Sequence, residues 1–564
     1  MRQTGSTGRS GIARDVMAGL TLAAITIPEQ MATARLGGFE PQIGFYAFVG
    51  ATAGFAIVAL LAAGANRILT AGADSTITPI FTATVAGLAA SGVAGQPQAA
   101  MTLALLVAAV LLIAGLLRLG WIADLLSTPI VTGFLLGIAA HIVASQLPDV
   151  MGLEAPSDNM IHRLSVLART AGDSNPWSVA IGFGVLALVL LSEKINPRWP
   201  GALVAMALAT AAVLAFGLER RGVEVLGHLP GGLPTPVAPA LSFDSLRALV
   251  PLALIVALIV MMQTAAVSRS FGDGNANVNR DYLGLALGNL GAALLGSFPV
   301  NASPPRTAVV REAGGTSQMA ALMAAAVVAA LALAGGGLLA HVPQAALAGV
   351  LLFVALRIVR ADVIASVARQ APGEAALIGL TAVAVIALPI PTGVAIGIGL
   401  SLLHGVWIAT QTRVTEFRHL PGTTIWWPAH TAKGTSDGGE TVEGVLVAGF
   451  SASLVFANAE PFRRGMEATI ATRSTIRLVV LEAGGIATVD YTAAQALRSL
   501  IESCRARDIV FAIARLESVR ARDALEKFNV LATLGADRLF MSVAEAVAAI
   551  PVAPGNTISA TPPR

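Results

Sequence analysis

The sequence predicts a polytopic α-helical membrane domain followed by a small water-soluble α/β domain. Of its 564 residues, 55% are hydrophobic and only 12% are charged, whereas a soluble domain has about 25% charged residues. The charge is also uneven, because residues 1–410 hold 38 of the 69 Asp, Glu, Lys and Arg residues. These proportions exclude an ordinary soluble enzyme and place the membrane domain first.

Windows without charge mark the membrane segments, since a helix needs about 20 apolar residues to cross the hydrocarbon. Three windows, at 75–117, 313–356 and 375–412, are each long enough for about two crossings. Residues 16–36 add a segment that Pro28 and Glu29 interrupt. We therefore expect about 12 to 14 segments. The windows for one crossing are 41–66, 125–148, 174–192, 199–218, 248–268 and 282–305.

The flanking charges predict the orientation. Residues 1–14 carry three arginines and no acidic residue, which favours a cytoplasmic N-terminus and no cleaved signal peptide. An even number of crossings would place the C-terminus in the cytoplasm too, in agreement with the single, unpaired Cys504. We expect a multi-pass protein of the inner (plasma) membrane with both termini in the cytoplasm, surrounded by membrane lipid.

Residues 441–552 alternate between strand and helix patterns, which is typical of a small α/β domain. Residues 411–440 form the expected linker, and residues 553–564 a disordered tail. Asp490 and Thr492 lie at a strand-to-helix turn, where both can cap a helix. The expected strands are 445–456, 476–481 and 509–514, and the expected helices are 462–471, 492–505, 521–534 and 543–550.

Two stretches, 70–76 and 300–307, interrupt the apolar pattern in a similar way, about 230 residues apart. Interrupted segments at matching positions indicate a transporter binding site between inverted repeats, here about 15–220 and 245–410. Two half-helices whose N-termini meet would offer free N–H groups and positive dipole ends to an anion. The substrate-binding candidates are Gly72, Ala73, Ser75, Ser303, Arg306, Thr307 and Ala308, with Gln30 lining the cavity.

The prolines at 304 and 305 suit a first helical turn, so that the first available donors would be the N–H groups of Arg306, Thr307 and Ala308. The guanidinium of Arg306 would add a fixed charge; the alternative is that it snorkels to the interface. Asp74 either caps a helix, or it has a functional role in which it balances Arg306 or takes up a proton. Glu29, after Pro28, is a candidate for proton coupling, unless it sits at the wet end of a tilted segment.

Other chemistry finds little support. His141, His341 and His404 are isolated, so we expect no metal and no cofactor. The chain shows no nucleophile–base set in its membrane part and no basic, aromatic-rich patch. We therefore expect neither an enzyme nor a nucleic-acid partner.

Short motifs stand at 15–21 (DVMAGLT), 27–32 (IPEQMA) and 37–41, and again at 298–309 (FPVNASPPRTAV) and 314–318. They resemble the first-helix signature and the tenth-helix region of the SulP anion transporters (the sulfate permease family). Residues 456–462 and 490–493 resemble the start and the Asp-x-Ser/Thr turn of the family's C-terminal STAS domain.

The resemblance implies fourteen segments in two inverted sevens, with segments 1–4 and 8–11 as a core and the others as a gate. It also implies an anion between half-helices 3 and 10, elevator-like alternating access and a homodimer. Gln263 stands where sodium-coupled members have an acid, so sodium coupling is not expected and Glu29 is left for the proton. Ala73 occupies a position where family members often have Pro, and Pro305 occupies one where many have Ser. Thr492 resembles a phosphorylatable, regulatory position of the STAS domain, and a simple helix cap is the alternative.

We therefore predict a secondary active transporter for a small inorganic or organic anion, coupled to protons. The substrate class, whether sulfate-type, bicarbonate or a dicarboxylate, stays open, as does symport against exchange. The alternatives are an uncoupled anion exchanger and a sensor that acts through its STAS domain.

Overall fold

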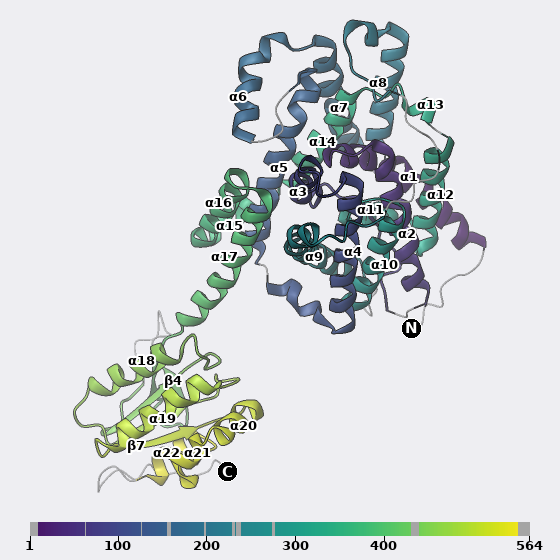
Figure 1. Ribbon diagram of the computed structural model, residues 1–564. Coiled ribbons are helices and arrows are strands. Elements are labelled where there is room, and N and C mark those ends of the chain that lie inside the picture. The colour runs from purple at the N-terminus through teal and green to yellow at the C-terminus, as the bar shows by residue number, and fades with distance from the viewer. Residues whose placement is uncertain are drawn as a thin grey trace. The chain divides into compact units, whose positions relative to one another are not determined.

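The computed structural model describes residues 9–61, 64–125, 127–154, 160–196, 199–227, 232, 238–272, 277–334, 336–429 and 439–550. It divides into two compact units, one up to Ser401 and one from Leu402 (Figure 1). Residues 1–8 of the expected cytoplasmic N-terminus and the whole expected tail at 553–564 lie outside the described residues.

The first unit is helical, and each predicted window contains a helix. The three long windows each divide into two helices, as predicted, and α1 continues through Pro28 without a break. Among the described residues, seven helices are long and apolar enough to cross a membrane. The main helices are α1 (Arg9–Leu36), α2 (Pro41–Leu61), α3 (Thr78–Ala90), α4 (Gln96–Leu116), α5 (Thr128–Met151), α7 (Pro176–Ile195), α8 (Gly201–Phe216), α9 (Phe243–Phe271), α10 (Val278–Leu294), α11 (Pro304–Glu312), α12 (Gln318–Ala334), α14 (Gln344–Ile358), α16 (Pro372–Ala387) and α17 (Ile390–Thr410).

The packing of these helices repeats between the two halves of the unit. The seven helices of the first half can be matched in order with seven of the second half, and contacts then recur between matched helices. The matched helices are α1 and α9, α2 and α10, α3 and α11, α4 and α12, α5 and α14, α7 and α16, and α8 and α17. Helix α1 packs against α12 as α9 packs against α4, and α5 packs against α16 as α14 packs against α7. The self-matched pairs α2–α10 and α5–α14 also pack together. Such an exchange pattern is what two related halves produce.

Two further helices in the described part of the chain, α6 (Met160–Thr170) and α15 (Ala361–Gln370), lie outside the predicted windows. The short α13 (Gly336–Leu339) lies inside the window 313–356, between its two main helices. Helices α6 and α15 carry arginines and polar residues among their apolar ones, so a search for charge-free windows cannot detect them.

Helices α2 and α10 pack with their backbones almost in contact through glycines. A Cβ atom at Gly54 would come within 2.1 Å of the Leu287 carbonyl oxygen on α10. We expect Gly54→Ala to destabilise the membrane unit by about 1–3 kcal/mol, as overpacking does, visible as a lower melting temperature in detergent. Gly184→Ala on α7, where no atom lies within 4 Å, is the matched control. Equal melting temperatures would contradict this packing.

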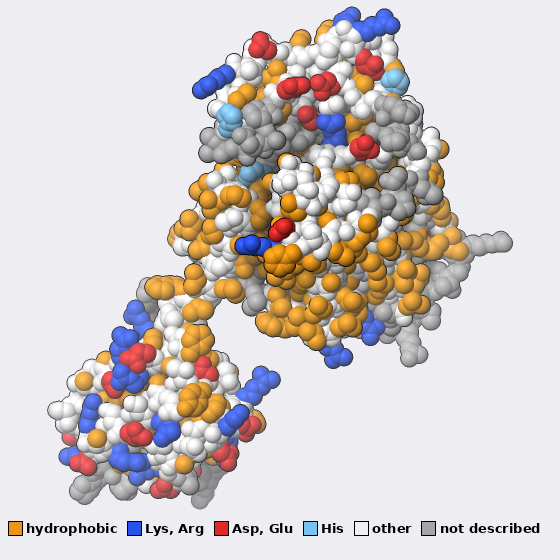
Figure 2. All heavy atoms as spheres, viewed as in Figure 1, with side chains coloured by type: hydrophobic (Ala, Val, Ile, Leu, Met, Phe, Trp, Pro, Cys, Tyr) orange, Lys and Arg blue, Asp and Glu red, His pale blue; other side chains and the backbone are white. Residues whose placement is uncertain are grey.

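The surface of the first unit suits a lipid environment. Figure 2 shows a broad area of hydrophobic side chains on it, with charged side chains gathered mainly beyond that area. The large exposed side chains include Leu61, Leu116 and Phe216, each at least 65% exposed. Such an area would be costly in water but is favourable in hydrocarbon.

The second unit contains a six-stranded sheet with strand order β4-β3-β5-β6-β7-β8. The last four strands in this order are parallel, and α18 (Ala459–Ala471) and α19 (Tyr491–Arg505) contact each other beside the sheet. The strands are β3 (Thr415–His419), β4 (Trp426–Pro428), β5 (Val445–Gly449), β6 (Leu478–Glu482), β7 (Val510–Ala514) and β8 (Leu539–Phe540), and the remaining helices are α20 (Val519–Lys527), α21 (Val530–Leu534) and α22 (Val543–Ala549).

Three predictions for this unit differ from the structure. The linker at 411–440 contributes β3 and β4, which pair antiparallel with the sheet; β3 (TEFRH) has no apolar run, and β4 is only three residues long. The strand predicted at 445–456 ends at Gly449. The helix predicted at 521–534 divides at Asn529, whose left-handed backbone (φ 59°) stops α20.

The single cysteine of the chain lies in this unit. Cys504 is buried on α19, and burial raises the pKa of its thiol to about 11 from an ordinary 9.0. The thiolate fraction at pH 7.5 is then about 100-fold lower than for a free cysteine. We expect iodoacetamide to leave Cys504 unmodified at pH 7.5 in the folded protein and to modify it after denaturation in urea. Rapid modification of the folded protein would contradict this burial.

Candidate functional site

Two short strands hold the two interrupted segments together. Strand β1 (Ala71–Gly72) precedes α3, strand β2 (Asn301–Ala302) precedes α11, and the two strands pair antiparallel. The Ser303 N–H donates to the Thr70 carbonyl at 2.9 Å, and the Thr70 N–H donates to the Thr307 hydroxyl at 3.1 Å. The segments predicted to meet therefore do meet, and the Thr307 hydroxyl, which also donates to the Ser303 carbonyl at 2.8 Å, joins them.

Arg306 lies on the first turn of α11 and is fully buried. Pro304 and Pro305 precede it in that turn and Ser303 caps the helix, so the local sequence fixes its position. One guanidinium nitrogen, Nη2, donates to the Ala73 carbonyl at 3.2 Å. In the described part of the chain, Nε and Nη1 have no hydrogen-bond partner. A buried cation with unused donors is suited to hold an anion.

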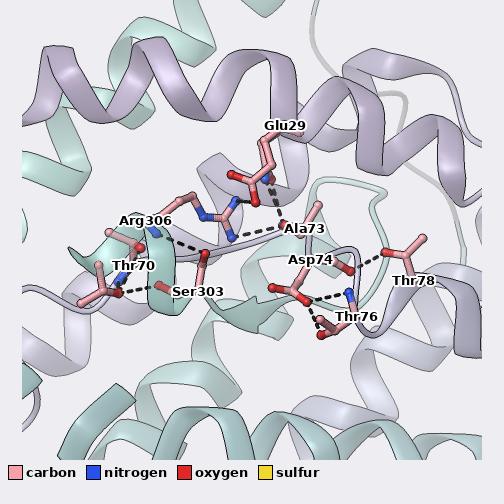
Figure 3. Close-up of polar contacts among 10 residues, drawn as sticks. Glu29, Thr70, Ala73, Asp74, Thr76, Thr78, Ser303 and Arg306 are labelled. Atoms are coloured by element: carbon pink, nitrogen blue, oxygen red, sulfur yellow. Dashed lines mark hydrogen bonds and ion pairs between the residues drawn. The ribbon is translucent and has the colours of Figure 1, made fainter. Parts of the chain in front are cut away.

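Glu29 faces Arg306 from α1. Its Oε1 lies 3.8 Å from Nη1 of Arg306, which is an ion pair without a hydrogen bond, and its side chain is 16% exposed (Figure 3). The Phe48 ring on α2 covers the same guanidinium, with 5.9 Å between the ring centroid and Cζ. The structure thus brings Glu29 and Arg306 together at the interruption, away from both ends of α1.

Gln30 fixes the backbone of the first interruption. Its Nε2 donates to the Ala73 carbonyl at 3.0 Å and its Oε1 accepts from the Ala73 N–H at 2.8 Å. A side chain at Gly72 would contact Nη1 of Arg306 and the Phe48 ring, both within 3.3 Å of a Cβ atom. Gly72 is thus the residue that lets the first segment approach the arginine.

Asp74 caps the turn before α3. Its carboxylate accepts from the N–H and the hydroxyl of Thr76, and its carbonyl accepts from the Thr78 hydroxyl at 2.8 Å. Among the described ion pairs, none joins Asp74 to Arg306. Of the two roles considered for Asp74, the geometry favours the cap.

Backbone donors at the site differ from the predicted set. The Arg306 N–H donates to the Ser303 hydroxyl at 3.5 Å and the Thr307 N–H to the Ser303 carbonyl at 3.0 Å. Both are therefore in use, and Ala308 is one residue further into the helix. On the other segment, the N–H groups of Asp74 and Ser75 and the Ser75 hydroxyl have no acceptor or donor partner among the described residues.

Gln263 on α9 is a site residue that the sequence reasoning set aside. Its Oε1 accepts from the Asn301 amide at 2.7 Å, and its Nε2 donates to the Thr76 hydroxyl at 2.7 Å. It therefore bridges both interruptions. A signal was present, because Gln263 follows Gln30 by 233 residues, close to the spacing of the two interruptions, and both are followed two residues later by Ala.

In the second unit, the cap at the expected turn is Asp490. Its carboxylate accepts from the Ala493 N–H at 2.8 Å and from the Phe456 N–H at 2.6 Å. Thr492 lies exposed in the first turn of α19. Asp490 is thus engaged within the fold, while the Thr492 side chain is accessible.

The chain matches the family described as Sulfate permease family over residues 12–381 and the STAS domain over residues 440–546. A probable sulfate transporter of Mycobacterium tuberculosis, MT1781, is 32% identical over 539 residues, which cover 95% of this chain and 94% of that protein.

Two solved structures share the fold. Murine solute carrier 26 family member A9, an anion transporter in the inward-facing state, has a TM-score of 0.85 at 20% identity, covering 96% of this chain and 92% of that one. The transmembrane domain of the cyanobacterial bicarbonate transporter BicA has a TM-score of 0.60 at 21% identity, covering 70% and 98%. The chain therefore belongs to the sulfate permease family of membrane anion transporters and carries a STAS domain at its C-terminal end.

Proposed function

We propose that this chain is a secondary active transporter that binds a small oxyanion between the two interrupted segments. The observation that carries the proposal is the fully buried Arg306, whose Nε and Nη1 form no hydrogen bond within the described part of the chain. The unpartnered Ser75 hydroxyl and the two N–H groups before α3 add donors on the other segment. Such donors favour an oxyanion of the sulfate, bicarbonate or dicarboxylate type. In this proposal, Ser303 and Thr307 shape the site, and Ala308 contributes only helix backbone.

Coupling to protons rests on Glu29 in this proposal. An empty site neutralises Arg306 with the Glu29 carboxylate, so an incoming anion competes with that carboxylate. A proton on Glu29 removes the competition, which favours joint binding of anion and proton. Arg306, Arg357 and Asp74 are the charged groups that act electrostatically on Glu29. Gln263, with both amide atoms engaged, offers no carboxylate to sodium.

Transport by an elevator-like movement is supported by how the helices pack. The matched helices α1 to α4 and α9 to α12 contact one another and form the proposed core, whereas α5, α7, α14 and α16 contact one another and form the proposed gate. Both interruptions belong to the core, so a bound anion would move with it. We propose a homodimer as the assembly, to be checked by mass determination of the purified protein.

We infer the orientation of the protein in the membrane from the charges at the end of the core where α1 begins. Described carboxylates at this end include Asp15 and Asp281, both buried. An excess of arginine predicts the cytoplasmic side, and we place this end and both termini there, in the inner (plasma) membrane. Arginines at this end include Arg14, Arg67, Arg118, Arg269, Arg280 and Arg311, which outnumber the exposed Glu312.

Uptake of labelled sulfate, bicarbonate and dicarboxylates into proteoliposomes, with and without an inward proton gradient, tests the proposal. Uptake of one class that the gradient accelerates is the expected result. Uptake that requires a counter-anion inside and ignores the gradient would establish an exchanger. No uptake of any anion, with a STAS unit that binds a regulatory partner through Thr492, would favour the sensor.

A further inference from the structure

A contact between α1 and the gate helix α14 shows how far along each of these two antiparallel helices a residue lies. Arg35, near the end of α1, donates through Nη2 to the Gln344 side chain at 2.7 Å, and Gln344 is the first residue of α14. The two helices pack together. Glu29 lies six residues before Arg35, about 9 Å along α1 at 1.5 Å per residue. Arg357 lies thirteen residues after Gln344, about 20 Å along α14. Arg357 is therefore about 11 Å beyond Glu29, toward the C-terminal end of α14.

Arg357 is a partly exposed arginine on the gate. Its side chain is 55% exposed, and it lies about 11 Å along the helix axis from the level of Glu29. The Phe353 ring, one helical turn earlier, lies 5.8 Å from Cζ of Arg357 and steadies the guanidinium. A half-exposed cation near a buried one raises the local concentration of anions.

Arg357 forms an ion pair with a carboxylate of the protein. Oε1 of Glu193, on the last turn of α7, lies 2.9 Å from Nη2 of Arg357, and the Glu193 side chain is 32% exposed. The same arrangement recurs deeper, where Glu29 occupies Arg306 at 3.8 Å. Each arginine along this line is thus paired with a carboxylate that an incoming anion can replace, and a partly exposed pair is held weakly enough for such exchange.

We propose that Arg357 is a second anion-binding position, an approach site on the gate and toward its proposed cytoplasmic end, at which a small oxyanion that approaches from that side displaces Glu193 before it moves to Arg306. This inference rests on the proposed function, because it assigns a step to the same anion. It gives Glu193 a role as a competing carboxylate, which lowers the affinity of the approach site and lets the anion leave it.

The test is the concentration dependence of uptake of the transported anion into proteoliposomes whose protein is inserted with the proposed cytoplasmic end outward, so that the anion meets Arg357 first. Arg357→Gln should raise the half-saturating concentration about 3- to 10-fold at low ionic strength and leave the maximal rate within about twofold. Glu193→Gln should lower the half-saturating concentration about two- to fivefold. The shift for Arg357→Gln should shrink when potassium gluconate screens the charge, and Arg357→Lys should restore the wild-type value.

The direction of the two shifts separates binding from support of the fold. If Arg357 and Glu193 served only to join α14 to α7, removing either partner would change uptake in the same direction, and the inference would be overturned. Unchanged half-saturation in Arg357→Gln, with active wild-type protein, would overturn it as well. Absence of uptake by the wild type itself would instead count against the proposed function.

Discussion

Arg306→Ala is expected to abolish anion uptake while the protein still folds and inserts. The side chain is fully buried and its Nε and Nη1 are unbonded among the described residues, so the polar contacts that the protein loses with it are the hydrogen bond to the Ala73 carbonyl and the ion pair with Glu29. A charge-assisted hydrogen bond contributes about 1.5–3 kcal/mol, and the loss of two with the charge itself should reduce uptake by at least about 100-fold. Initial rates in proteoliposomes measure this loss.

The control for this variant is on the same helix. Arg311→Ala removes an exposed arginine that donates to the Ser270 carbonyl at 3.1 Å and should leave uptake close to the wild-type rate. Arg306→Lys keeps the positive charge, as a compact ammonium group, but loses the planar guanidinium donors, so an intermediate uptake rate is expected. Substantial uptake by a well-folded Arg306→Ala protein would refute the role given to Arg306.

Glu29→Gln is expected to retain anion binding but to lose acceleration by the proton gradient. The amide resembles the protonated carboxyl in size and lacks its charge, so Arg306 is permanently open to the anion. Uptake by the wild type should rise as the outside pH falls, because protonation relieves the competition at Arg306, whereas uptake by the variant should not change with pH. Rates measured at several outside pH values, at constant membrane potential, provide the comparison.

Glu40→Gln is a suitable control, since Glu40 lies in the connection after α1 and accepts from the Gln42 side chain at 2.7 Å. Its uptake should keep the wild-type pH dependence. A Glu29→Gln protein that still responds to the gradient would move the coupling to another group, with Asp74 next, because it too acts electrostatically on this region.

The sequence predicted the membrane helices and the meeting of residues 70–76 with 300–307, because hydrophobic runs and their interruptions are local signals. It did not predict which hydrogen-bond donors at the site remain available to an anion. The Arg306 N–H is taken by Ser303 and the Thr307 hydroxyl by the Thr70 backbone, and these bonds depend on how distant segments pack. Gln263 was considered only as a missing acid, since a single sequence does not show that its amide reaches Asn301 and Thr76 at once.

The pairing of β1 with β2 has a consequence for how the chain is made. Each strand is two residues long, and each finds its partner only in the other half of the membrane unit. During synthesis, the first half therefore leaves the ribosome with polar backbone groups that nothing yet satisfies in hydrocarbon. At about 5–20 residues per second, the matching strand follows roughly 10 to 50 s later, so the insertion machinery must shelter the first half for that time.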